Sequence, residues 1–179
     1  MSSILKVNTL QDAGGNAILT SDGSGKLTTQ KINYPAFEAS LSSTQSVSND
    51  TTVKIQINSE ILDTDNCYDN STNYRFTPTV AGKYFVYAKA RGQSSGDNLL
   101  RDINLSVYKN GSLLSKTTWL LRNNYERAAT PSIFNIVDMN GSSDYVELYG
   151  KITQPTGTPD GFIGSAYRET IFGAYRIGS

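Results

Sequence analysis

The densest group of side chains whose oxygen atoms could bind a metal ion lies in a polar, turn-rich stretch at positions 61–74. Its carboxylate and amide side chains belong to Asp63, Asp65, Asn66, Asp69 and Asn70. Oxygen ligands of this kind suit calcium, but the stretch lacks the central glycine and closing glutamate of a calcium-binding loop. We therefore predict a solvated loop at 63–69 and no metal site, with calcium as the alternative that stays open.

The residues needed for familiar enzyme chemistry are missing or incomplete. The 179 residues include no histidine, which removes the usual base of Ser and Cys nucleophiles and the commonest zinc ligand. The glycines at 92–96 lack the lysine and the following helix of a phosphate-binding loop. Asp and Glu side chains could form a pair for glycoside cleavage, but the sequence singles out no such pair. We predict that the chain is not an enzyme and needs no cofactor.

Aromatic side chains in or beside loops suggest a second kind of chemistry, stacking against a sugar ring. These side chains are Trp119, Tyr125, Phe162 and Tyr167. The competing interpretation is that most of them belong to the core or to an interface. A ligand platform on these four residues is therefore one of two interpretations, and placement in the core or an interface is the other.

The overall composition limits the classes of partner that we expect for this chain. Sixteen basic residues balance sixteen acidic ones, so an electrostatic groove for nucleic acid or a patch for an acidic membrane is not expected. The single cysteine, Cys67, can form no intrachain disulfide. No apolar run reaches secretory or membrane-spanning length, and we expect a soluble protein made in a cytoplasm, with one main core.

Short extended segments separated by turn residues make up the chain from residue 34 onward. The clearest strand is 82–90, and Asn110 with Gly111 predicts a tight hairpin. Further strands are predicted at 36–41, 53–57, 74–77, 103–108, 112–121, 133–139, 144–153 and 169–177. Because no segment combines helical spacing with caps, we predict an all-β, antiparallel jelly-roll sandwich for residues 34–179.

The strand at 82–90 carries large side chains on both faces. Tyr84 and Val86 alternate with Phe85 and Tyr87. One face of a sandwich sheet packs on the opposite sheet while the other normally meets water, so two apolar faces indicate an additional partner. A second copy of the chain is the simplest partner.

Residues 1–33 differ from the rest and form an extended N-terminal β arm of short segments cut by glycine turns. The arm is too small to bury a core alone. Its apolar residues are Ile4, Leu5, Val7, Leu10, Ile18 and Leu19. Either the arm is a mobile tail, or it is ordered by strand addition to other copies or to a larger assembly. These apolar residues favour docking.

Several motifs, in order, resemble the globular head of the complement C1q and tumour necrosis factor superfamily over residues 35–178. The motifs are Tyr68-Asp69, Arg75-Phe76, Gly82-Lys83-Tyr84-Phe85, Lys109-Asn110-Gly111, Val146-Glu147-Leu148 and Phe172-Gly173-Ala174-Tyr175. The resemblance implies a ten-stranded jelly roll that forms a tight homotrimer and binds partners without catalysis. The trimer interface is accordingly expected at Tyr84, Tyr87, Phe172 and Tyr175.

The arm departs from that superfamily, because it has neither collagen repeats nor a membrane anchor. Instead, the segments 5–12 and 17–25 resemble the leader of tailed-phage virion proteins, including those of cyanophages. The combined resemblance implies a trimeric structural protein on the virion surface, made in the host cytoplasm. Such a protein would be a capsid decoration or cement protein or a short fibre, attached by its arm to capsid or tail proteins. The alternative is a receptor-binding adhesin of a tail fibre or spike that recognises host polysaccharide.

Overall fold

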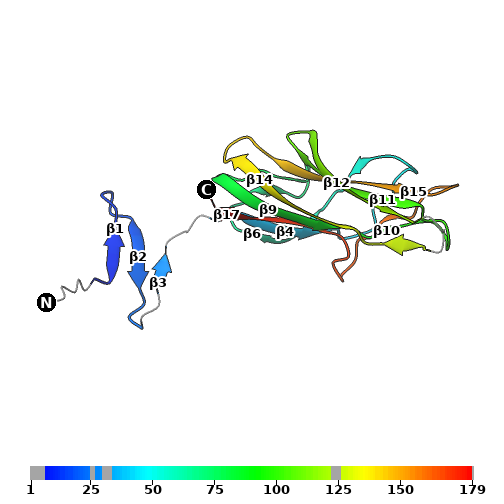
Figure 1. The fold of residues 1–179 in the computed structure, drawn as a ribbon. Helices are drawn as coiled ribbons and strands as arrows, with labels where there is room; N and C mark the ends of the chain where they lie inside the picture. Colours follow the sequence, from blue (N-terminus) through cyan, green and yellow to red (C-terminus); the bar gives the residue numbers. More distant parts are fainter. Residues whose placement is uncertain (1–6, 25–26, 30–33, 122–125, 179) are drawn as a thin grey trace. The chain divides into compact units, whose positions relative to one another are not determined.

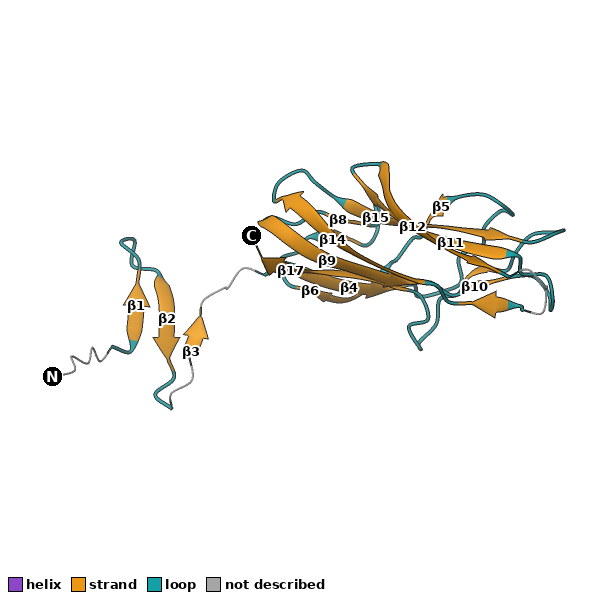
Figure 2. Cartoon of the chain, viewed as in Figure 1, coloured by secondary structure: helices purple, strands orange, loops and turns teal. Residues whose placement is uncertain are grey.

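The computed structural model describes residues 7–24, 27–29, 34–121 and 126–178. The chain divides into two compact units, Met1–Tyr34 and Pro35–Ser179. Strands and loops, with no helix, make up the described residues (Figure 2), which confirms the all-β prediction. Within this described part, no helix is long and apolar enough to cross a membrane.

The N-terminal unit is a small antiparallel sheet in the order β1-β2-β3. Its strands are β1 (Thr9–Gln11), β2 (Ala17–Ser21) and β3 (Leu27–Thr29). The carboxylate of Asp12 accepts hydrogen bonds from the backbone N–H groups of Gly14 and Asn16, at 2.8 and 2.9 Å. This side chain therefore holds the turn between the first two strands, in which Gly15 adopts a positive φ of 82°.

The second unit is a sandwich of two antiparallel sheets (Figure 1). The five-stranded sheet has the order β14-β9-β17-β4-β6 and contains β14 (Ser132–Asn140), β9 (Ala81–Lys89), β17 (Ile171–Gly178), β4 (Ala36–Ser40) and β6 (Ser59–Asp63). The six-stranded sheet has the order β12-β11-β15-β8-β7, with β5 also paired to β15. Its strands are β12 (Ser112–Leu120), β11 (Asp102–Lys109), β15 (Val146–Thr153), β8 (Arg75–Phe76), β7 (Tyr68–Asp69) and β5 (Val53–Lys54).

The core lies between the two sheets and follows from strict alternation along the long strands. In β11, Ile103, Leu105 and Val107 are completely buried. The aromatic centre of the core is Phe37 of β4, whose ring stacks on Tyr68 and meets Phe172 edge-on, with centroid distances of 4.3 and 5.0 Å. Residues from both sheets thus meet in one packed interior.

A third, three-stranded sheet closes one end of the sandwich. It has the order β13-β10-β16, from β13 (Ala128–Ala129), β10 (Gly92–Gln93) and β16 (Gly161–Phe162). The ring of Phe162 is fully buried and lies over Gly150, where an added Cβ would come within 2.3 Å of it. The glycine therefore makes the space that this ring fills.

The predicted hairpin at Asn110 and Gly111 is confirmed. Both residues have positive φ angles, 52° and 75°, and Lys109 pairs with Ser112 across the turn. The sequence reading missed β6, β7, β10, β13 and β16. Four of these strands have only two residues, and β6 shows no alternation of buried and exposed positions.

Candidate interface and ligand site

The outer face of the five-stranded sheet carries a cluster of apolar side chains, which we call the aromatic face. It consists of Phe85 and Tyr87 of β9, Phe134 and Ile136 of β14, and Tyr175 of β17. The ring of Phe85 lies 6.1 Å from that of Phe134 and 5.5 Å from that of Tyr175. Phe134 and Ile136 remain 64% and 66% exposed in the single chain. A continuous exposed cluster of this kind marks an interaction surface.

A polar contact fixes the position of one ring in the aromatic face. The hydroxyl of Tyr87 donates a 2.7 Å hydrogen bond to the carboxylate of Glu38, which also lies 3.6 Å from the guanidinium of Arg168. The Tyr87 ring lies directly over Gly173. A Cβ at this position would come within 2.4 Å of the ring, so the glycine leaves the room that the ring needs. Partial burial, followed by the bond to Glu38, raises the pKa of Tyr87, so the hydroxyl stays protonated.

The four residues predicted for the trimer interface lie on opposite faces of this sheet. Tyr87 and Tyr175 belong to the aromatic face. Tyr84 and Phe172 are completely buried in the core, and the hydroxyl of Tyr84 donates to the carbonyl of Val80 at 2.7 Å. Burial raises the pKa of Tyr84 to about 12. These two residues can present no surface to a second copy, so their assignment to the interface is corrected to the core.

The sequence already places Phe85 on the same strand face as Tyr87, but the predicted interface does not include it. Phe134 and Ile136 were not predicted for this face, although they alternate with buried Ile133 and Val137.

A second exposed apolar surface lies on the edge strand β12, and we call it the apolar edge. It consists of Trp119 and Leu120, adjacent residues that are 47% and 63% exposed and point to opposite sides of the sheet at its edge. Trp119 pairs with Ile103 of β11. Among the described residues, exposed apolar side chains thus occur both on a sheet face and on the edge of the other sheet.

The arm residues are placed only in part. Leu10 and Ile18 are about half exposed on the small N-terminal sheet, as is Val7 just before it, and Leu19 is partly buried. Ile4 and Leu5, also predicted for docking, lie outside the described residues. Three of the six predicted docking residues therefore present exposed apolar surface.

The predicted ligand platform is not assembled among the described residues. Phe162 belongs to the core, where it is fully buried, so its assignment to a platform is corrected. Tyr167 is 87% exposed in the loop before β17, while Trp119 lies on β12 of the other sheet. Tyr125 lies outside the described residues.

In the acidic stretch at 63–69, two carboxylates bind backbone groups. Asp63 accepts hydrogen bonds from the N–H groups of Cys67 and Tyr68 at 3.0 and 2.8 Å. Asp69 accepts from the N–H groups of the three residues that follow Asn70, and these bonds lower its pKa. Within the described part of the chain, no group of three potential ligands is arranged to hold a metal ion. These carboxylates hold turns.

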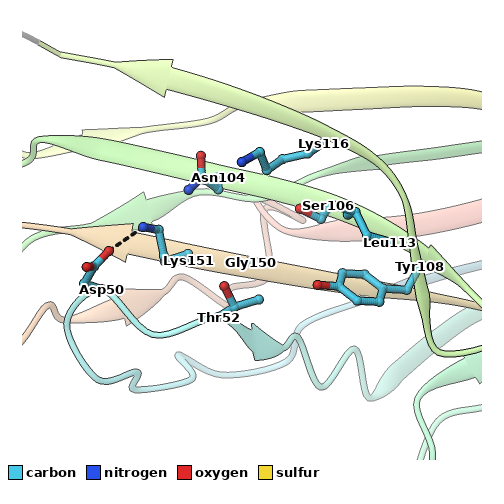
Figure 3. Close-up of a pocket in the computed structure, with 9 residues that line it drawn as sticks. All are labelled: Asp50, Thr52, Asn104, Ser106, Tyr108, Leu113, Lys116, Gly150 and Lys151. Atoms are coloured by element: carbon cyan, nitrogen blue, oxygen red, sulfur yellow. Dashed lines mark hydrogen bonds and ion pairs between the residues drawn. The ribbon is translucent and has the colours of Figure 1, made fainter.

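A polar pocket of about 360 Å³ lies on the six-stranded sheet (Figure 3). Its lining residues are Asp50, Thr52, Asn104, Ser106, Tyr108, Leu113, Lys116, Gly150 and Lys151. Three of them, Asn104, Ser106 and Tyr108, alternate along β11 with the buried aliphatic residues of the core. The sheet therefore places one row of β11 in the core and the other in the pocket.

The pocket has one neutralised and one unneutralised ammonium group. Lys151 forms an ion pair with Asp50, as Figure 3 shows, and hydrogen bonding to Lys151 lowers the pKa of Asp50. Lys116 forms no hydrogen bond or ion pair with any described residue. It projects from β12 beside Ser106, its strand partner. The pocket consequently carries one uncompensated positive charge.

Comparison with known proteins identifies the fold. No family model matches the sequence, and no curated protein matches it. Solved structures do match. The globular domain of zebrafish complement 1qA has 12% identity and a TM-score of 0.55, with 81% of this chain and 98% of that chain covered.

Two further structures give the same result. Murine APRIL at pH 5.0 has 9% identity and a TM-score of 0.58, with 81% and 100% covered. Eiger TNF from S. frugiperda has 10% identity and a TM-score of 0.53, with 82% and 94% covered. The chain therefore has the jelly-roll fold found in C1q and tumour necrosis factor proteins, as the motifs predicted.

Proposed function

We propose that the chain is a non-enzymatic, homotrimeric jelly-roll head on the surface of a tailed-phage virion, attached through its N-terminal arm. The observation that carries the trimer is the aromatic face. Phe134 and Ile136 are about two-thirds exposed in the single chain, and burial of such side chains between copies removes apolar surface from water. The C1q and tumour necrosis factor folds among its structural neighbours are consistent with this assembly.

The two apolar surfaces support a closed ring. If the apolar edge of one copy, Trp119 and Leu120, packs against the aromatic face of the next, each contact joins two different surfaces. Head-to-tail contacts of this type form a closed ring when the rotation between copies closes. Three copies would bury both surfaces on every subunit.

The arm is the proposed attachment element. Among the described residues, the buried core lies between Phe37 and Ala174, so no described arm residue contributes to the interior of the head. The arm offers short strands with unpaired edges and half-exposed Val7, Leu10 and Ile18, features suited to strand addition. Capsid or tail proteins are the proposed partners, and a capsid decoration protein or a short fibre is the proposed role.

A binding assay with phage particles tests this role. Tailed-phage particles assembled without this protein should bind the purified chain saturably. The variant Val7→Asp/Leu10→Asp/Ile18→Asp should lose particle binding and still have the same oligomeric mass. Retained binding by this variant would refute the docking role, and absence of the protein from purified virions would refute the virion assignment.

A second candidate function is a receptor-binding adhesin for host polysaccharide. The polar pocket favours it, because none of the residues that line the pocket belongs to the aromatic face or to the apolar edge, the two surfaces of the proposed contact between copies. A trimer formed through the aromatic face could therefore present three such pockets.

A further inference from the structure

We propose that the pocket on the six-stranded sheet binds a carboxylated sugar unit, of the hexuronic acid class. This inference rests on the second candidate function and specifies the chemistry of its ligand. Three observations carry it: unpaired polar groups that converge on one hollow, a single uncompensated ammonium group, and an apolar wall of the right kind for a sugar ring.

The first observation concerns Ser106, in the middle of the pocket. The residue as a whole is only 5% exposed, and its hydroxyl forms no hydrogen bond with any described residue. The hydroxyl lines a pocket large enough to hold a ligand group, so it is free to donate to or accept from a ligand there. The hydroxyl groups of Thr52 and Tyr108 face the same pocket and also lack partners within the described chain (Figure 3).

The second observation is that, among the polar groups lining the pocket, hydrogen-bond donors outnumber the acceptors that are still free. Asn104 uses its side-chain oxygen to accept a 2.6 Å hydrogen bond from Thr118, which leaves its NH₂ group as a donor. Lys116 adds an ammonium group, while one oxygen of the Asp50 carboxylate, Oδ1, is already engaged by both Lys151 and Thr153. A ligand that complements these groups must supply acceptors and negative charge, as a carboxylate does.

The third observation distinguishes a sugar acid from a bare anion. The pocket volume of about 360 Å³ far exceeds what a small anion fills, and suits a sugar ring. One wall consists of the ring of Tyr108 and the side chain of Leu113. The Tyr108 ring is held by Tyr149, whose ring centroid lies 4.2 Å away. A fixed aromatic ring suits the C–H face of a sugar, and the hydroxyl groups around it suit the ring hydroxyls.

The test compares two ligands that differ only in the group at one carbon. Methyl glucuronide and methyl glucoside share a ring, but the first carries a carboxylate where the second has a hydroxymethyl group. Binding to the full chain is measured by isothermal titration and by saturation-transfer NMR at constant ionic strength. We expect the glucuronide to bind at least tenfold more tightly than the glucoside.

Two variants and one control assign the difference to the pocket. Lys116→Met should reduce glucuronide affinity about tenfold, to near that of the glucoside, with little change for the glucoside. Tyr108→Phe should weaken both ligands several-fold. Lys83→Met removes a half-exposed lysine from the opposite sheet and should change neither.

Several results would overturn the proposal. These are equal affinity for both glycosides, no saturable binding of either, or glucuronide affinity unchanged in Lys116→Met. Inorganic phosphate that displaces the glucuronide and binds as tightly would show a site for small anions only, and would also overturn it. The mass of each variant in solution is measured in parallel, so that failure of sugar binding is distinguished from failure of the trimer.

Discussion

The two faces of the five-stranded sheet should respond in opposite ways to the same truncation, Phe to Ala. Phe172 of β17 is fully buried in the single chain, whereas Phe134 of β14 is 64% exposed. Phe172→Ala therefore removes core packing, and Phe134→Ala removes surface that only a second copy could cover. The pair separates the stability of the subunit from the stability of the assembly.

The expected changes in the free energies of unfolding and association follow from how deeply each ring is buried. Phe172→Ala should destabilise the subunit by about 3–5 kcal/mol, the usual cost of emptying a buried aromatic site. For Phe134, burial of roughly 80 Å² of additional apolar surface at about 25 cal/mol per Å² corresponds to about 2 kcal/mol per subunit. Three copies give about 6 kcal/mol per trimer, or about four powers of ten in the association constant. The Phe134→Ala subunit itself should change by no more than about 0.5 kcal/mol.

Sedimentation velocity over a dilution series measures the assembly, and urea unfolding at low concentration measures the subunit. Phe134→Ala should dissociate at concentrations where the wild type stays associated, with an unchanged urea midpoint once both are monomeric. The reasoning is refuted if Phe134→Ala assembles like the wild type, or if it lowers the subunit's stability as much as Phe172→Ala does.

Two further predictions concern the head alone. Gly150→Ala should lower the free energy of unfolding by about 1–3 kcal/mol, because the new Cβ would lie 2.3 Å from the buried ring of Phe162. The control is Gly178→Ala, where an added Cβ meets nothing within 4 Å. Equal urea midpoints for the two variants would contradict the packing argument. The second prediction is a loss of stability in acid. Hydrogen bonds from the backbone N–H groups of residues 71–73 hold the pKa of Asp69 well below its unfolded value, so its contribution is complete above about pH 4 and is lost as the pH falls towards the folded pKa. Asp69→Asn should be less stable than the wild type at pH 7, and urea titrations should show this difference narrowing below pH 4; a difference independent of pH would contradict the assignment.

Much of the fold could be predicted from the sequence because the long strands obey a simple alternation. The strands at 81–89, 102–109 and 132–140 combine β-branched or aromatic residues with turn signals at their ends, and each lies within about one residue of its predicted bounds. The two-residue strands at 92–93 and 161–162 could not be predicted, since they are defined by pairing with each other across a long stretch of sequence. The strand at 68–69 pairs with the nearby segment 75–76, but two residues are too few to show a period.

The site was predicted less well, for two different reasons. The alternation rule already separates Tyr84 from Tyr87, and Phe172 from Tyr175, because each pair is an odd number of positions apart on one strand. Their placement in one interface was therefore an avoidable error. The pocket is different, since it combines Asp50 and Thr52 from a loop with side chains from three strands. Only the register of β11 with β12 and β15 brings these residues together.

The most direct measurement is the mass of the full chain in solution. Multi-angle light scattering at micromolar concentration should give three times the 19.5 kDa of one chain, because the aromatic face and the apolar edge of each subunit are then covered by its neighbours. A mass of 19.5 kDa at the same concentration, with the aromatic face open to water, would contradict the account.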